Sequence, residues 1–136
     1  MADARHPRGL IDTSVVIDLE LIAPDRLPLE LAISAITLAE LSAGPHATTD
    51  PAERARRQDR LQRAEATFEP LAIDAAAARA YGRVYAAVAT AGRKARGRRA
   101  VDLLIAATAL AADLPLYTRN PEDFVGLSEL VEVVEV

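Results

Sequence analysis

Short apolar runs alternate along this chain with longer segments in which apolar and polar positions repeat at helical spacing. The short runs predict buried strands at 9–11, 31–34, 68–73, 114–118 and 130–134. The longer segments predict helices at about 15–19, 36–43, 51–67, 75–92 and 100–112. Because strands alternate with helices, the pattern indicates an α/β fold with a parallel sheet covered on both faces.

The expected helix boundaries carry recognisable signals. Thr13 or Ser14 is suited to cap the first helix, and Asp74 to cap the alanine-rich fourth one. Asp50 followed by a proline is typical of a helix start, as Gly44 followed by a proline is of a helix end. The basic segment 93–99 contains a glycine and is interpreted as a loop.

The length of 136 residues predicts one domain that spans 1–136. No apolar run approaches the roughly 18–20 residues that a membrane span needs. The polar start, residues 1–8, lacks the apolar core of a signal peptide. We therefore expect a cytoplasmic protein with no membrane association.

The residue types that are missing limit the chemistry. Without cysteine there are no disulfides, thiolate nucleophiles or cysteine-based zinc sites. The two histidines, His6 and His46, do not stand at metal-ligand spacing, which argues against zinc. A metal in this protein would be held by oxygen atoms, and oxygen ligands favour magnesium or manganese.

The net charge of −4 argues against a surface coated in positive charge, but the cations are unevenly distributed. Of the 16 cations, 15 are arginines, and ten lie in the two stretches 54–63 and 93–99. Guanidinium groups bind phosphate in a bidentate fashion, so local arginine clusters favour phosphate binding. The first stretch also carries acidic residues, which makes a solvated helix face its simpler interpretation.

Acidic and amide side chains follow several of the predicted strands. Asp12, Glu40, Asp102, Asn120 and Asp123 are the candidates. Each has a simple structural alternative: a turn or cap, a solvated helix face, the first turn of a helix, or the start of an Asn-Pro turn. Asp102 is hardest to dismiss, because it lies in the nearly apolar helix 100–112 and a buried unpaired carboxylate is costly.

These side chains are expected to meet, because ligands of open parallel sheets bind beyond the carboxyl ends of the strands. Several oxygen ligands at one sheet edge are typical of a site for a hard cation such as Mg²⁺. A cation in such a site can generate hydroxide and neutralise the charge that develops on a phosphate during in-line displacement.

Four segments, in this order along the chain, resemble the motif blocks of PIN-domain ribonucleases, and in particular of VapC-type toxins from type II (VapBC) toxin–antitoxin systems. They are LIDTS at 10–14, ISAITLAEL at 33–41, DLLIAA at 102–107 and LYTRNPEDF at 116–124. The resemblance implies one PIN-like α/β/α sandwich with a central, mainly parallel sheet of about four to five strands. It also implies an Mg²⁺-dependent endoribonuclease, in which Mn²⁺ can substitute.

The resemblance assigns roles residue by residue. Asp12, Glu40 and Asp102 match the metal-holding acids, and Asp123 matches a further catalytic acid. Asn120 stands at a position that is aspartate in many PIN domains, so it leaves open whether one metal binds or two. Thr13 matches the hydroxyl-bearing residue beside the first aspartate. The substrate-binding candidates are Ser14, Thr118 and Arg119, with the arginines of 93–99 as a wider RNA grip.

The same resemblance implies partners. The substrate would be RNA, with transfer or ribosomal RNA favoured because unpaired bases in loops can be recognised directly. A VapB-type antitoxin would bind a groove beside the early helix, to which Val15, Val16, Leu19 and Leu21 would contribute, although core packing is the simpler role for them. A homodimer and a larger toxin–antitoxin assembly are expected.

Two other interpretations remain. Haloacid-type and receiver-like phosphoryl-transfer domains also place aspartates after parallel strands, but the first needs an acid where Ser14 stands. The second needs a lysine late in the sheet, and the single lysine, Lys94, precedes the helix of Asp102. A PIN-like module that binds RNA or protein without cutting stays open because of Asn120.

Overall fold

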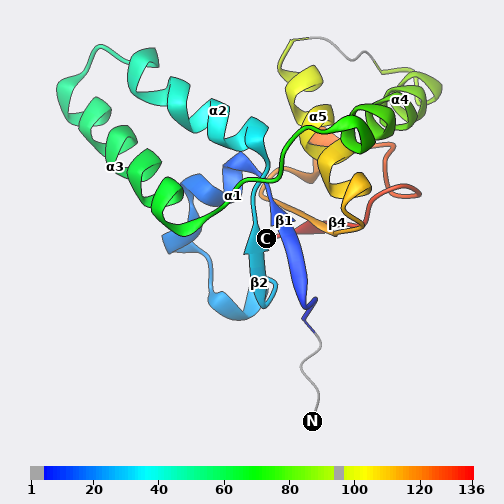
Figure 1. Ribbon diagram of the computed structural model, residues 1–136, viewed down its shortest axis with the longest axis horizontal. Coiled ribbons are helices and arrows are strands. Elements are labelled where there is room, and N and C mark those ends of the chain that lie inside the picture. The colour runs from blue at the N-terminus through cyan, green and yellow to red at the C-terminus, as the bar shows by residue number, and fades with distance from the viewer. Residues whose placement is uncertain (1–4, 94–96) are drawn as a thin grey trace.

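The computed structural model describes residues 5–93 and 97–136, and these residues form a three-layer α/β/α sandwich (Figure 1). Its central sheet has four parallel strands in the order β2-β1-β3-β4. The strands are β1 (Arg8–Ile11), β2 (Glu30–Ala32), β3 (Leu116–Thr118) and β4 (Val133–Glu135). The α-helices are α1 (Thr13–Ile17), α2 (Ala35–Ala43), α3 (Pro51–Thr67), α4 (Ala75–Thr90) and α5 (Arg98–Ala111).

Successive strand residues point to opposite faces of the sheet and so build two cores. Leu10 and Leu116 pack with α4 and α5 on one face, whereas their neighbours Ile11 and Tyr117 pack with α1, α2 and α3 on the other. Figure 1 shows α2 and α3 on one side of the molecule and α4 and α5 on the other. Because both faces are covered, the central strands are almost entirely apolar, as a parallel sheet requires.

The helix predictions are largely confirmed, with corrections at the ends. The helix 51–67 is confirmed without change, and Asp74 caps α4 by accepting a hydrogen bond from Ala77 N–H. The first helix is capped by Asp12 and not by Thr13 or Ser14. The predicted loop 93–99 is wrong at its end, because α5 already begins at Arg98; residues 94–96 lie outside the described residues.

The strand predictions are confirmed for the centre of the sheet and wrong at its edges. Residues 68–73 form no strand but a single parallel bridge between Leu71 and Ser34. The last strand begins at Val133, three residues later than predicted. Both segments are apolar enough for a strand, but backbone pairing is decided by the neighbouring chain, which the local sequence does not encode.

None of the helices in the described part of the chain is long and apolar enough to cross a membrane.

Candidate functional site

The site begins where β1 and β3 end side by side. Asp12 follows β1, and its backbone N–H donates to the carbonyl of Tyr117 in β3 at 3.0 Å. The Asp12 side chain is only 6% exposed. Its Oδ1 accepts hydrogen bonds from the Val15 N–H at 3.1 Å and the Ser14 hydroxyl at 2.6 Å. Burial raises the pKa of Asp12, and hydrogen bonds from Ser14, Thr118 and Val15 partly offset this increase.

Thr118 is fully buried at the end of β3, which changes its expected role. Its hydroxyl oxygen accepts a 3.0 Å hydrogen bond from the Asn120 N–H, and its side chain also hydrogen-bonds to Asp12. A side chain without solvent exposure does not reach an RNA strand, so the substrate-binding role predicted for Thr118 does not fit its position. Its contacts make it a residue that orients Asp12 and the turn of Asn120.

Glu40 reaches the same edge from α2, which follows β2. It is half-buried, and its Oε1 accepts a 2.6 Å hydrogen bond from the hydroxyl of Thr13, the residue after Asp12. This bond brings the second predicted metal ligand beside the first. Thr13 Oγ1 also lies 3.1 Å from the Oγ1 of Thr37, which stands one helical turn before Glu40.

Asp102 supplies the electrostatic signature of the site. It lies in the first turns of α5, and its pKa is raised from 3.8 to about 6. Burial is the largest cause, followed by the negative charge of Asp123 and, more weakly, those of Glu40 and Asp12; the nearby Arg98 opposes them. Carboxylates from four separate segments therefore act on one another here, as the topology predicted.

The donor set fits a hard cation in its chemistry. The side chains that interact at this edge offer carboxylate and hydroxyl oxygens, and mutual repulsion of the carboxylates is the situation that a cation relieves. No three acidic or histidine side chains within 5–93 and 97–136 stand at ligand distance around one point.

Arginine side chains lie around the acidic cluster. The Arg99 guanidinium donates a hydrogen bond to the backbone carbonyl oxygen of Asp123 at 3.2 Å. The positive charge of Arg98 lowers the pKa of Asp102 and so partly offsets the increase described above. Arg119 forms an ion pair with Asp18, with Nε 3.4 Å from Oδ2. Of the predicted RNA-binding segment 93–99, Arg98 and Arg99 are the residues that interact with the acidic cluster. Residues 94–96 lie outside the part that the structure describes.

Sequence analysis missed Asp18 and Thr37 as parts of the site. Asp18 ends α1 and pairs with Arg119, a contact across about a hundred residues that no local pattern encodes. Thr37 had a usable signal: it precedes Glu40 by three residues, so both lie on the same face of α2.

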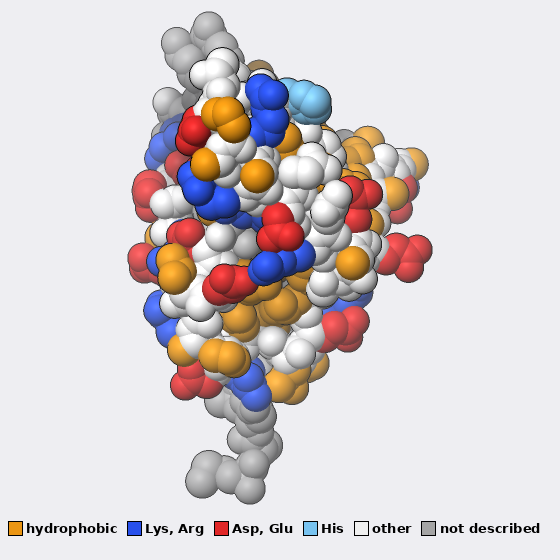
Figure 2. Space-filling model, turned by 90° about the vertical axis from the view of Figure 1, so that its left-hand side faces the viewer, with side chains coloured by type: hydrophobic (Ala, Val, Ile, Leu, Met, Phe, Trp, Pro, Cys, Tyr) orange, Lys and Arg blue, Asp and Glu red, His pale blue; other side chains and the backbone are white. Residues whose placement is uncertain are grey.

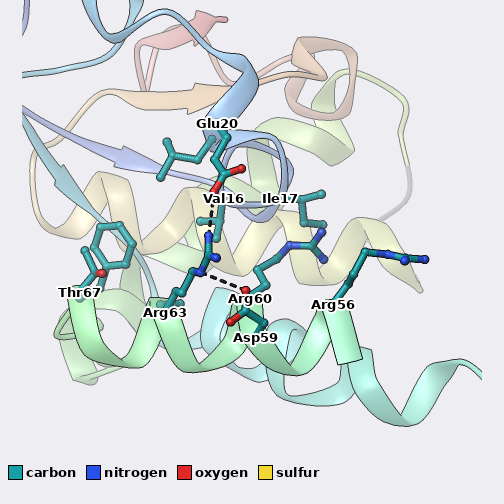
Figure 3. Close-up of a pocket in the computed structure, with 11 residues that line it drawn as sticks. Val16, Ile17, Glu20, Arg56, Asp59, Arg60, Arg63 and Thr67 are labelled. Carbon is teal, nitrogen blue, oxygen red and sulfur yellow. Dashed lines mark hydrogen bonds and ion pairs between the residues drawn. The ribbon is translucent and has the colours of Figure 1, made fainter. Parts of the chain in front are cut away.

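A separate groove runs between α1 and α3, with a cavity volume of about 330 Å³ (Figure 3). Its apolar lining is contributed by Val16, Ile17, Leu19, Ala64 and Phe68. Arginines of α3 line it as well, and Figure 3 shows Arg63 linked to both Glu20 and Asp59. The space-filling view shows side chains of both charges around apolar side chains on this side of the molecule (Figure 2).

The family model for the PIN domain matches residues 10–129. The chain is 36% identical to "Ribonuclease VapC5" of Mycobacterium tuberculosis, with 94% of this chain and 95% of that protein covered. It is also 36% identical to "Ribonuclease VapC4" of the same organism, with 95% and 97% covered. Each of these two alignments thus covers nearly the full length of the chain.

A solved structure of VapBC-5, a member of the VapBC family of toxin–antitoxin systems from M. tuberculosis, is similar at a TM-score of 0.81. The sequence identity is 34%, and 96% of this chain and 99% of that chain are covered. The match of the family model, the two relatives and the shared architecture agree with one another, and the chain belongs to the PIN-domain family.

Proposed function

We propose that this protein is a metal-dependent endoribonuclease toxin that hydrolyses phosphodiester bonds in RNA and is neutralised by a VapB-type antitoxin. Its relatives VapC5 and VapC4 are named ribonucleases, and the similar VapBC-5 structure belongs to a toxin–antitoxin system. One observation carries the catalytic part: the raised pKa of Asp102, to about 6, in a cluster of four carboxylates. Carboxylates that repel one another and have raised pKa values are typical of functional sites, where a bound cation offsets their repulsion.

Asp12, Glu40 and Asp102 would hold Mg²⁺, with Mn²⁺ as a substitute, and Asp123 is the nearby fourth acid. When bound, the cation would supply a water of lowered pKa and a positive charge that stabilises the phosphate in the transition state. Asn120 adds an amide oxygen without charge, so the proposal favours one tightly held cation over two.

The remaining residues of the site position and neutralise the substrate. Arg119 stands beside Ser14 and is available to bind a phosphate oxygen in place of Asp18. Arg98 acts on the charge of Asp102, and Arg99 hydrogen-bonds to the backbone of Asp123. In this arrangement the scissile phosphate of the RNA would face the acids through the bound cation. The flanking phosphates would contact the guanidinium groups of the nearby arginines.

The groove between α1 and α3 is the proposed seat of the antitoxin. Val16 and Leu19 line it together with Phe68, which follows α3, whereas Val15 is fully buried in the core and does not line it. Leu21, which follows the groove-lining Glu20 in the sequence but does not itself line the groove, is 76% exposed, and a partner could cover it. Because α1 begins directly after Asp12, a chain bound there would extend to the acidic cluster.

The RNA class is proposed on general grounds. Cleavage of transfer or ribosomal RNA in loops is favoured because splayed bases expose their edges to a small enzyme. We further propose that the toxin acts in the cytoplasm as a homodimer within a larger complex with its antitoxin.

The catalytic proposal is tested by induced expression of the wild type, Asp12→Asn and the control Asp50→Asn, with mapping of new RNA ends. Asp50 is exposed, and its side chain forms no capping hydrogen bond. Growth arrest and discrete new ends are expected with the wild type and Asp50→Asn alone. Arrest by Asp12→Asn without new ends would instead establish a binding protein that does not cut.

The antitoxin site is tested with Arg60→Glu, since Arg60 lines the groove, and with Arg79→Glu on α4, across the sheet, as the control. Co-expressed antitoxin should fail to rescue growth for Arg60→Glu and should rescue it for Arg79→Glu. Equal rescue, together with equal affinity in a pull-down with the purified antitoxin, would exclude this groove.

A further inference from the structure

We propose that a buried chain of hydroxyl groups, from Ser34 through Thr37 to Thr13, positions the carboxylate of Glu40 for a divalent cation. This inference rests on the proposed metal-dependent function, and it assigns a role to two residues, Ser34 and Thr37, that do not touch the cation. We call the chain the hydroxyl relay. It joins two elements, since Ser34 caps α2, Thr37 lies in the first turn of α2 and Thr13 begins α1.

The hydroxyl groups contact one another in the order Ser34, Thr37 and Thr13, and Thr13 contacts the carboxylate of Glu40. Ser34 Oγ lies 3.5 Å from Thr37 Oγ1, which is a long contact, and Thr37 Oγ1 lies 3.1 Å from Thr13 Oγ1. Thr13 Oγ1 lies 2.6 Å from Glu40 Oε1, which is the shortest contact of the series. Ser34 and Thr37 have no solvent exposure, so water does not replace these bonds.

The number of protons fixes the direction of the relay. Each hydroxyl has one proton to donate, and a carboxylate only accepts. Thr13 must therefore donate to Glu40, which leaves its oxygen to accept from Thr37. The backbone N–H of Thr37 donates to Ser34 Oγ at 3.1 Å, so the Ser34 hydroxyl is free to donate toward Thr37.

The hydroxyl of Thr37 has a different kind of partner from the hydroxyls of other serine and threonine residues in the helices. Ser42 donates to the carbonyl of Leu38, and Thr108 to that of Leu104, four residues earlier in each case. Thr37 is also helical and buried, but its hydroxyl contacts other side chains. The Thr37 hydroxyl therefore hydrogen-bonds to a side chain of α1, and not to a backbone carbonyl of its own helix.

The effect on Glu40 is geometric. The relay engages Oε1 of Glu40 and holds the carboxylate in one orientation, with Oε2 left for a cation. Partners of this kind typically affect metal affinity by about 10–100-fold. Because Thr37 acts through Thr13, we expect its loss to cause a change near the lower end of that range.

The test measures the affinity for Mn²⁺ alone, by titration with detection of free Mn²⁺ by electron paramagnetic resonance, in the purified full-length protein. Thr37→Val removes the hydroxyl and keeps the shape, and Thr37→Ser restores the hydroxyl. Thr108→Val is the matched control, since Thr108 is 2% exposed and its hydroxyl bonds within α5. Thr13→Val removes the hydroxyl that contacts Glu40, which is the last contact of the relay.

We expect Thr37→Val to weaken Mn²⁺ binding by about tenfold and Thr13→Val by at least as much. Thr37→Ser and Thr108→Val should bind as the wild type does. In RNA cleavage, kcat should fall for Thr37→Val while KM is unchanged, because Thr37 is fully buried and touches no RNA.

Three outcomes would overturn the relay. Wild-type affinity in Thr37→Val is the first, and an equal loss in Thr108→Val, which would indicate general loosening of the core, is the second. If Thr37→Val does not fold, Thr13→Val decides, and wild-type affinity there is the third. Absence of Mn²⁺ binding by the wild type itself would instead overturn the proposed metal site.

Discussion

The hydroxyl of Ser14 accepts a 3.1 Å hydrogen bond from the backbone N–H of Arg119, across 105 positions of sequence. The same hydroxyl donates to Asp12 Oδ1 at 2.6 Å. One side chain therefore ties the end of β1 to the end of β3 and fixes the segment of Arg119 relative to Asp12. The proposed metal-binding Asp12 and the backbone of the proposed phosphate-binding Arg119 are thus positioned by a single hydroxyl group.

Ser14→Ala should reduce both activity and stability. It removes two hydrogen bonds at a half-buried position, one of them to a carboxylate, so we expect a loss of about 1–3 kcal/mol in the free energy of unfolding. RNA cleavage should fall by about tenfold or more. Urea unfolding and cleavage rates measure the two effects. Ser42→Ala is the control, because Ser42 is exposed and bonds within α2. Wild-type cleavage by Ser14→Ala would contradict the positioning role.

Asp102→Asn should stabilise the protein at neutral pH when no divalent cation is present. The folded protein raises the pKa of Asp102 from 3.8 to about 6, so folding favours the protonated carboxyl. The stability this contributes is fully present below pH 4 and is lost as the pH rises through about 6. The asparagine variant does not titrate, and at pH 8 it should gain about 1 kcal/mol, a value discounted for the partial exposure of Asp102.

Urea unfolding at pH 4 and pH 8, in the presence of a chelator, measures this difference. No gain is expected at pH 4, where both side chains are neutral. Added Mg²⁺ should then stabilise the wild type more than the variant, since only the wild type offers the full set of carboxylates. If the variant were less stable than the wild type at pH 8 with chelator, the ionised Asp102 carboxylate would not be destabilised by burial, and the prediction would be wrong.

Asp123→Asn should lower the pKa of Asp102. The charge of Asp123 is the second-largest cause of the raised value, after burial. NMR titration of the Asp102 side-chain carboxyl carbon follows the change directly. Glu122→Gln is the control, because Glu122 is exposed and is not among the causes of the shift. An unchanged titration of Asp102 in Asp123→Asn would place Asp123 outside the acidic cluster.

Asp18→Asn and Arg119→Ala should change RNA binding in opposite directions. Asp18 pairs with the Arg119 guanidinium at 3.4 Å and so competes with phosphate for it. Asp18→Asn should lower KM for RNA, whereas Arg119→Ala should raise it. Both should alter stability by less than about 1 kcal/mol, as is usual for partly exposed ion pairs. Asp25→Asn, at an exposed turn, serves as the control. A higher KM in Asp18→Asn would mean that Asp18 holds Arg119 in its productive position.

Gly9→Ala should destabilise the sheet, whereas Gly82→Ala should not. A Cβ at Gly9 would stand 2.6 Å from Cε1 of Tyr117, a ring that is 3% exposed and has no room to move. We expect a loss of about 1–3 kcal/mol, as for overpacked cores. Nothing lies within 4 Å of a Cβ at Gly82 in α4, where alanine should gain about 0.5–1 kcal/mol. Thermal unfolding compares the two, and equal effects would contradict the packing at β1.

Much of the fold could be predicted from local pattern, because periodicity and caps are local properties. The helix 51–67 and the cap at Asp74 followed from charge spacing and from one aspartate. The candidate acids could be found in the same way, since the ends of parallel strands share one edge. Residues 68–73 could not be assigned correctly, because an apolar run becomes a strand only where a neighbour offers its backbone.

The sequence by itself determined which oxygen-bearing residues this protein has to offer and on which segments they stand. Only the tertiary structure decided how they are held: Thr118 buried against Asp12, Thr37 facing Thr13, and Asp18 paired with Arg119. The physical reason is distance along the chain. Hydrogen bonds and charges act over a few ångströms in space, and partners that are tens of residues apart meet only after the sheet has brought its strand ends together.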